Sequence, residues 1–134
     1  MRIRTARPKD RPAARGLAAS LGLDYPSMDT DDFWIAEEDG RIAGICGLMR
    51  RPDCQELCSL GVAEDSRGRG IGGDLVRALL ADTPGDIYLA TVIPDFFGKA
   101  GFSRTSVYPE SMRKSPEWCE GCRADLCTVM VRQA

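Results

Sequence analysis

Glycines and arginines gather in a short stretch that joins an apolar segment to an amphipathic one. This stretch, residues 60–72, reads Leu-Gly-Val-Ala-Glu-Asp-Ser-Arg-Gly-Arg-Gly-Ile-Gly. Glycines allow positive φ and a close approach of the backbone to a ligand, so several N–H groups and the positive end of a helix dipole can converge on one anion. Arg67 and Arg69 add positive charge. The pattern predicts a pyrophosphate-binding loop at the start of a helix.

Two well-known phosphate-binding loops do not fit this stretch. A Walker loop requires Lys followed by Ser or Thr at the start of the helix, where this chain has residues 71–73, Ile-Gly-Gly. The dinucleotide-binding loop requires an acidic residue about 20 residues further on. Asp86 is a poor candidate for it, because it comes before the next predicted strand. We therefore expect neither a nucleotide triphosphatase nor a nicotinamide-dependent enzyme.

The remaining pattern is Arg67-x-x-Gly70-x-Gly72 after Leu-x-Val, followed one helix and one strand later by residues 94–102, Pro-Asp-Phe-Phe-Gly-Lys-Ala-Gly-Phe. In this order the two motifs resemble the GNAT superfamily of acetyl-CoA-dependent N-acetyltransferases. The resemblance covers nearly the whole chain and implies a mixed α/β fold, with a central, mostly antiparallel sheet of about seven strands and helices on both faces. It also implies that acetyl-CoA is the co-substrate. The residues that it assigns to acetyl-CoA are Leu60, Gly61, Val62, Arg67, Gly68, Arg69, Gly70, Ile71, Gly72, Gly73 and Phe97.

A narrower resemblance concerns the acceptor of the acetyl group. Residues 56–62, Glu-Leu-Cys-Ser-Leu-Gly-Val, and residues 109–111, Pro-Glu-Ser, are similar to the acetyltransferase domain of N-acetylglutamate synthases, in a short form without the kinase domain. Trp118 and Arg123 match that group more loosely. The resemblance implies a small amine acceptor, a free amino acid such as glutamate. Acetylation of a protein or peptide amino group is an alternative.

Glu56 is the residue that we expect to act as the general base. Amine acetylation requires removal of a proton from an ammonium group and stabilisation of an oxyanion, for which a backbone N–H near Leu60 or Gly61, opened by a bulge at Gly61, is the expected donor. A merely solvated strand glutamate is the alternative reading of Glu56. The cations considered for an acceptor carboxylate are Arg50, Arg51, Arg113, Lys114 and Arg123.

Phe97 departs from the wider superfamily. Many members place a Tyr there to protonate the departing thiolate, and Phe has no proton to donate. A non-catalytic acyl-CoA-binding module therefore stays an alternative to an enzyme.

The elements expected to position these residues follow from local patterns. Asp39-Gly40 between two apolar runs predicts a β-hairpin. Asp10 is expected to cap a helix with Pro12 in its first turn and Ala13, Leu17 and Leu21 on one face, and Gly22 to end it. The other expected helices are the one after the glycine loop, as far as Asp82, and residues 94–100. The expected strands are residues 3–7, 33–38, 41–49, 56–62, 87–92, 102–108 and 126–132.

Composition limits the function further. The chain has 134 residues, 43% of them hydrophobic, and is expected to form one domain, residues 1–134. A formal charge of −2 provides no global field for nucleic acid or membrane, and no apolar run approaches the ~20 residues of a membrane span. We expect a cytoplasmic protein without nucleic-acid or membrane partners, and a homodimer is one expectation for its oligomeric state. The absence of histidine excludes Ser-His-Asp and Cys-His mechanisms.

Six cysteines raise the question of a metal site. Cys119, Cys122 and Cys127 have a spacing that only partly fits zinc, and no histidine is available as a ligand. We expect no bound metal and buried thiols instead.

Overall fold

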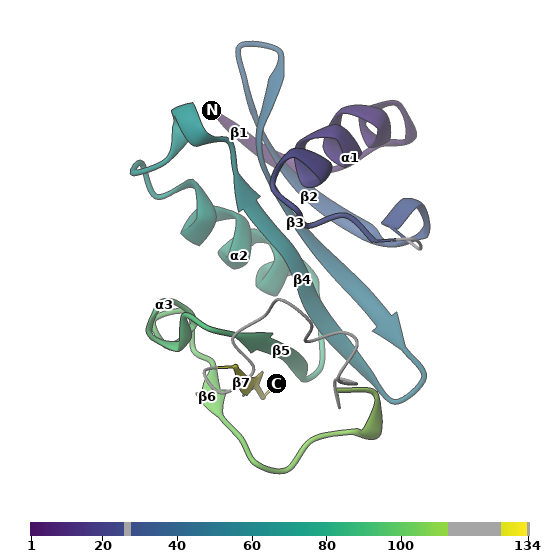
Figure 1. The fold of residues 1–134 in the computed structure, drawn as a ribbon, viewed down its shortest axis with the longest axis vertical. Helices are drawn as coiled ribbons and strands as arrows, with labels where there is room; N and C mark the ends of the chain where they lie inside the picture. The colour runs from purple at the N-terminus through teal and green to yellow at the C-terminus, as the bar shows by residue number, and fades with distance from the viewer. Residues whose placement is uncertain (26–27, 113–126, 134) are drawn as a thin grey trace. The chain divides into compact units, whose positions relative to one another are not determined.

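The computed structural model describes residues 1–25, 28–112 and 127–133. Seven strands form one mixed sheet with the order β1-β2-β3-β4-β5-β7-β6, as the GNAT resemblance implied (Figure 1). The strands are β1 (Arg2–Thr5), β2 (Asp32–Glu38), β3 (Arg41–Arg51), β4 (Cys54–Val62), β5 (Ile87–Thr91), β6 (Ser103–Arg104) and β7 (Thr128–Arg132). The helices are α1 (Arg11–Ser20), α2 (Ile71–Asp82) and α3 (Pro94–Gly98), with 3₁₀ turns η1 (Pro8–Asp10), η2 (Met28–Thr30), η3 (Glu64–Ser66) and η4 (Glu110–Met112). Within the described residues, no helix combines the length and the apolar character needed to cross a bilayer.

The chain divides into two compact units. The first unit contains residues 1–49 and 57–84, and the second contains residues 50–56 and 85–134. The β4–β5 pair is parallel, whereas β1–β2, β2–β3, β5–β7 and β6–β7 are antiparallel.

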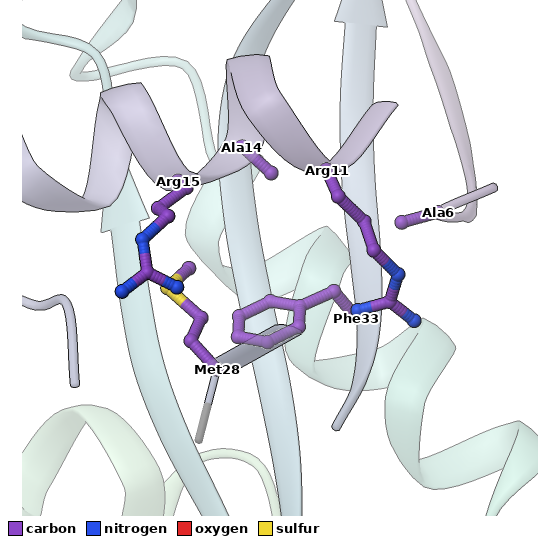
Figure 2. Close-up of a pocket in the computed structure, with 6 residues that line it drawn as sticks. All are labelled: Ala6, Arg11, Ala14, Arg15, Met28 and Phe33. Carbon is purple, nitrogen blue, oxygen red and sulfur yellow. The ribbon is translucent and has the colours of Figure 1, made fainter. Parts of the chain in front are cut away.

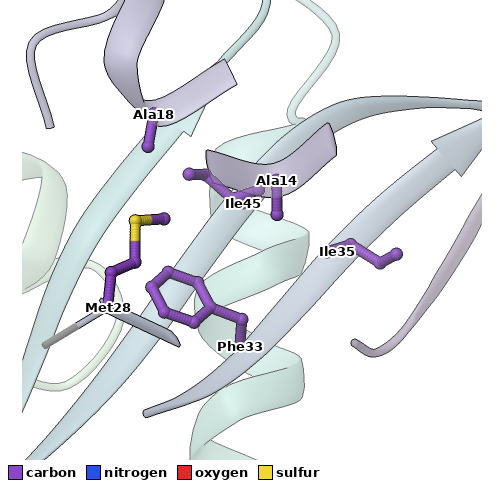
Figure 3. Packing of buried hydrophobic residues seen from close by; sticks show 6 residues of the cluster. All are labelled: Ala14, Ala18, Met28, Phe33, Ile35 and Ile45. Carbon is purple, nitrogen blue, oxygen red and sulfur yellow. The ribbon is translucent and has the colours of Figure 1, made fainter. Parts of the chain in front are cut away.

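Strand β2 of the first unit is buried on both faces. Phe33 and Ile35 pack with Ala14 and Ala18 of α1, in the cluster that Figure 3 shows. Trp34 lies on the other face, where its Nε1 donates to Asp82 Oδ2 at the end of α2 over 2.8 Å. Successive side chains of a strand point to opposite faces, so a strand that is covered by helices on both faces needs an unbroken run of apolar residues, as β2 has.

Two glycines of β3 let its neighbours approach closely. A Cβ on Gly47 would lie 2.7 Å from the ring of Phe33, which is its partner across the β2–β3 pair. A Cβ on Gly44 would lie 3.0 Å from Leu75 of α2. Each glycine therefore makes room for a large side chain, one on each face of the sheet.

The hairpin predicted at Asp39-Gly40 is confirmed. Asp39 has φ +53° and Gly40 has φ +78°, the left-handed pair that a two-residue type I′ turn requires. Asp and Gly are among the residues that adopt this conformation at the least cost, so the dipeptide determines how β2 and β3 are joined.

The start and the buried face of α1 differ from the prediction. Ala14 and Ala18 are buried, whereas Ala13 is exposed and Leu17 only flanks the core. The Asp10 carboxylate does not cap α1, because it accepts hydrogen bonds from the Arg4 guanidinium at 2.7 and 3.1 Å and from the Arg7 N–H at 2.8 Å. Small side chains at the contact bring the helix close to the sheet.

Strand β6 of the second unit is much shorter than the predicted strand 102–108. The Thr105 N–H still donates to the Val129 carbonyl at 3.0 Å, but the Thr105 hydroxyl then bonds the N–H and the carbonyl of Val107. This side-chain turn directs the chain away from β7 and leaves Val107 81% exposed. An apolar residue in the sequence was therefore misread as part of the strand.

Arg4 links three segments of the first unit, since it also donates to Glu37 Oε2 at 3.0 Å. Its hydrogen bonds, with that of the Arg7 N–H, hold the pKa of Asp10 well below the ordinary value of 3.8. A lowered folded-state pKa means that the carboxylate stabilises the fold above about pH 4, and that this contribution is lost as the pH falls toward the folded-state value.

Asp10→Asn should therefore lower the melting temperature near pH 7, and the deficit should shrink as the pH is lowered to about 3. Asp39→Asn is the matched control, because Asn tolerates the left-handed turn position and its effect should be small at both pH values. Thermal denaturation followed by circular dichroism measures both variants. An Asp10→Asn deficit of the same size at both pH values would contradict this assignment.

Candidate functional site

The predicted glycine loop joins β4 to α2 in the first unit. Beyond Val62 the Ala63 N–H donates to the Ala43 carbonyl at 2.7 Å, and η3 follows with Ser66 buried. Gly68 and Gly70 have φ of +82° and +79°, so both need the left-handed conformation that glycine provides. Gly70 is the residue from which α2 starts.

The first turn of α2 presents backbone donors. The first hydrogen bond within the helix runs from the Asp74 N–H to the Gly70 carbonyl at 3.1 Å, so the N–H groups of Ile71, Gly72 and Gly73 have no acceptor inside the helix. Ile71 has its side chain buried and offers only its backbone. With glycine at the next two positions, the helix start carries positive partial charge behind little side-chain bulk, as an anion site requires.

Both predicted arginines of the loop already contact the protein. Arg67 Nε donates to the Val62 carbonyl at 3.1 Å, which holds this side chain against the end of β4. Arg69 Nη2 donates to Glu38 Oε1 at 2.9 Å, and this hydrogen bond lowers the pKa of Glu38. Arg69 remains half exposed, so the ion pair restrains its position without burying its charge.

Strand β4 has a kink, at Ser59 rather than at the predicted Gly61. Ser59 has φ +51°, and its hydroxyl donates to the Leu23 carbonyl at 2.8 Å. Cys58 lies beside Gly47 and the Phe33 ring, and a Cβ on Gly61 would lie 2.7 Å from Leu23 on that same α1 side. In a regular strand, Cys58 and Gly61 would lie on opposite faces because they are three residues apart. Both lie on the α1 side here, so the alternation shifts by one residue across Ser59, as in a β-bulge.

This kink corrects the expected role of Gly61. Its φ is not among the left-handed ones, and its missing side chain instead makes room for Leu21 and Leu23, each 2.7 Å from the position of a Cβ. The expected oxyanion donors, the N–H groups of Leu60 and Gly61, come directly after the kink, and that role stays a prediction.

Tyr25 is a residue that the sequence did not single out. Its hydroxyl donates to Asp31 Oδ2 at 2.6 Å and lies 3.5 Å from Cys58 Sγ, one residue before the kink. Burial is the main cause that raises the pKa of Tyr25 far above its ordinary value, so the phenol stays protonated. Together with the Ser59 hydroxyl, it ties the segment after α1 to β4.

Glu56, the predicted base, is buried in the second unit. It is 6% exposed, and its Oε1 accepts a hydrogen bond from Arg51 Nε at 2.6 Å. Across the sheet its partner is Tyr88 of β5. The alternative reading, a glutamate that faces solvent, is therefore wrong. The sequence offered one sign of the ion pair: opposite charges flank the Pro52-Asp53 turn, where two antiparallel strands meet.

The turn between Arg51 and Glu56 is itself held in place. Asp53 Oδ2 accepts a hydrogen bond from the Ser111 N–H at 3.2 Å, and the Ser111 hydroxyl is the main cause that lowers the pKa of Asp53. Gln55 Nε2 donates to the Asp86 carbonyl at 3.3 Å. The predicted Pro-Glu-Ser segment thus contacts the hairpin that carries Glu56. Arg113, Lys114, Trp118 and Arg123 lie outside the described residues.

Phe97 belongs to an aromatic cluster of the second unit. Its ring packs edge-on against Phe96 and Phe102, with centroids 5.0 and 5.8 Å away, and Phe97 is only 5% exposed. Packing explains this side chain without a ligand, and its predicted contact with acetyl-CoA stays a prediction.

The described cysteines carry free thiols. Burial raises the pKa of Cys46 well above its ordinary value, and burial with the nearby Asp53 raises the pKa of Cys54 to about 11, so both stay protonated at neutral pH. Over residues 1–25, 28–112 and 127–133, no three potential ligands gather into a metal site. Cys119 and Cys122 lie outside these ranges, and the expected absence of metal stays a prediction.

A small pocket lies under α1, and none of its lining residues is among the predicted site residues. Figure 2 shows it between the helix and Phe33. Arg11 Nη1, at its edge, donates to the Asp31 carbonyl at 3.0 Å. The pocket has room for about one water molecule, too little for a substrate. Its lining residues are Ala6, Arg11, Ala14, Arg15, Met28 and Phe33.

Comparison with solved structures supports the fold. N-acetylglutamate synthase from Neisseria gonorrhoeae, complexed with coenzyme A and N-acetyl-glutamate, has a TM-score of 0.76 at 23% identity, covering 98% of this chain and 34% of its own. Rv2747 from Mycobacterium tuberculosis, in complex with CoA, has a TM-score of 0.73 at 21% identity, covering 100% and 99%. A GNAT-family acetyltransferase from Staphylococcus aureus Mu50 has a TM-score of 0.71 at 18% identity, covering 98% of each chain. The present chain thus spans about a third of the gonococcal synthase.

Sequence comparison supplies the family. No curated protein sequence matches the chain. Residues 29–104, more than half of the chain, match the family model described as Acetyltransferase (GNAT) domain. The region matched includes the glycine loop and residues 94–102, the two motifs on which the resemblance was based. The chain therefore belongs to the GNAT acetyltransferase family.

Proposed function

We propose that this acetyltransferase moves an acetyl group from acetyl-CoA to the amino group of a free amino acid such as glutamate. The observation that carries the proposal is the first turn of α2, where three N–H groups without helical acceptors follow a left-handed glycine. Coenzyme A contains a pyrophosphate that such a turn can bind. The glycine loop, residues 67–73, is the proposed site for it, and Leu60 and Val62 are the proposed partners of the pantetheine amides.

Glu56 is proposed as the general base. The acceptor nitrogen must lose a proton, which passes to the carboxylate directly or through a water molecule, before its lone pair attacks the thioester carbonyl carbon. The N–H of Leu60 or Gly61 stabilises the resulting oxyanion, and collapse breaks the C–S bond. Phe97 cannot protonate the thiolate, but a thiol has a pKa of about 8.5, so the thiolate is a tolerable leaving group near neutral pH.

Two observations support an amino acid as the acceptor. The gonococcal neighbour is complexed with N-acetyl-glutamate, and the Pro-Glu-Ser segment that resembles its group contacts the Glu56 hairpin through Asp53 and Ser111. A second candidate, a non-catalytic acyl-CoA-binding module, rests on Phe97 at the position of the missing acid. Release of free CoA thiol during incubation with acetyl-CoA and acceptor is expected of the acetyltransferase and not of the binding module.

Gly72→Asp should weaken acetyl-CoA binding by about tenfold or more, because a carboxylate at the helix start repels the pyrophosphate and blocks the backbone. Isothermal calorimetry measures the affinity, and circular dichroism checks the fold. Gly16→Asp, at an exposed position of α1 with open space around it, is the matched control and should bind as the wild type does. Wild-type affinity in a folded Gly72→Asp variant would refute the proposed cofactor site.

Glu56→Gln should lower kcat by roughly 10²-fold while leaving acetyl-CoA affinity nearly unchanged, since the amide keeps the size of the side chain but cannot take the proton. The variant also breaks an ion pair, so Glu37→Gln, which removes a carboxylate paired with Arg4, is the control for that loss alone. Steady-state kinetics with both substrates varied gives the result. Full activity of Glu56→Gln at every pH would show that water or another group, and not Glu56, accepts the proton of the acceptor ammonium.

Glutamate should be acetylated faster than glutamine, because a site with charge-assisted hydrogen bonds to a second carboxylate discriminates against the neutral amide. Mass spectrometry of reactions with the twenty amino acids and with a pool of lysine-containing peptides tests this. Faster acetylation of the peptides would disprove the amino-acid acceptor and leave the family assignment unaffected.

A further inference from the structure

We infer that Arg51 determines the specificity for α-amino acids, by holding the Glu56 carboxylate on one side and binding the α-carboxylate of the acceptor on the other. This inference rests on the proposed function. The sequence left five cations as candidates for an acceptor carboxylate, and of these Arg51 forms a hydrogen bond with the proposed base.

Arg51 and Glu56 contact each other across the β3–β4 hairpin. Arg51 ends β3 and Glu56 lies near the start of β4, so the hairpin brings the two side chains together. Arg51 Nε donates to Glu56 Oε1 at 2.6 Å, a short distance that is typical of a charge-assisted hydrogen bond. The Glu56 side chain is 8% exposed and that of Arg51 is 21% exposed. The Glu56 side chain is thus enclosed, while part of the Arg51 side chain reaches solvent.

Arginine can bind a second carboxylate while it holds the first. Its guanidinium carries five N–H donors in a planar fork, of which the contact with Glu56 uses the one on Nε. The two Nη groups carry the other four and match the spacing of a carboxylate. A lysine at this position would provide a point charge but no such fork.

A carboxylate next to a guanidinium is the complement of an α-amino acid. In that substrate the ammonium and the carboxylate are bonded to the same carbon, so both must be bound within a few ångströms of each other. Glu56 would receive the ammonium and its proton, and Arg51 the carboxylate. An amine without an α-carboxylate, such as a lysine side chain of a peptide, offers only the ammonium group and would leave the Arg51 donors without a carboxylate partner.

The hairpin provides the rigidity that this arrangement needs. Asp53, which lies between Arg51 and Glu56, accepts a hydrogen bond from the Ser111 N–H, and Gln55 donates one to the Asp86 carbonyl. Two fixed charges bind a zwitterion better than two mobile ones, because their side chains lose less conformational freedom on binding.

The experiment compares one amino acid with its decarboxylated amine. For glutamate the amine is 4-aminobutyrate, and the measured quantity is the ratio of the two kcat/KM values in wild type, Arg51→Gln and Arg51→Lys. We expect Arg51→Gln to lower this ratio by about tenfold or more, chiefly through the KM for glutamate, with the KM for acetyl-CoA unchanged. Arg51→Lys keeps the charge beside Glu56 and should lower the ratio several-fold with kcat nearly retained.

Arg41→Gln is the matched control, since Arg41 lies at the other end of β3, is exposed and pairs with Asp65. It should keep the wild-type ratio. If Arg51→Gln does not fold, the Arg51→Lys variant decides, and a ratio equal to that of the wild type overturns the inference. If the wild type releases no CoA with any free amino acid, the proposed function fails and the inference fails with it. If glutamate is acetylated but neither Arg51 variant changes the ratio, the inference alone is wrong.

Discussion

Burial of the β2–β3 hairpin on both faces is the constraint on which the first unit depends. Phe33 and Ile35 need the small residues of α1 above them, and Trp34 needs α2 on the other side. The buried middle of a hairpin covered in this way must be closely packed, and Gly44 and Gly47 make room for the large side chains beside them. The placement of α2, and with it the glycine loop, follows from this packing.

A buried ion pair plays the corresponding part in the second unit. Replacing a buried pair by apolar residues is often neutral or stabilising, whereas removing one partner costs about 3–5 kcal/mol. Arg51 and Glu56 therefore contribute little that a leucine pair could not contribute to stability. The roles proposed for Arg51 and Glu56 give a reason for a charged pair in this hairpin, which Asp53 and Gln55 hold in place through hydrogen bonds.

The sequence predicted those features that depend on local chemistry. The Asp39-Gly40 turn and the glycine loop before α2 follow from backbone conformations that few residues adopt. The partners that individual side chains choose could not be predicted. The contact of Arg51 with Glu56 depends on how β3 and β4 pair, the hydrogen bonds of Asp10 depend on where Arg4 lies, and the early end of β6 depends on one threonine hydroxyl. Serine also gave no sign that residue 59 would be left-handed.

The shifted alternation in β4 has a consequence for protein engineering. Leu60 and Val62 have the same parity as Cys58, yet the kink at Ser59 places them on the opposite face of the strand. A design that treats β4 as a regular strand would thus assign polar and apolar side chains to the wrong faces beyond residue 59. Deleting the single extra residue at the kink would restore regular alternation and leave each remaining position on its present face, whereas a deletion elsewhere in β4 would move the positions on one side of it to the opposite face.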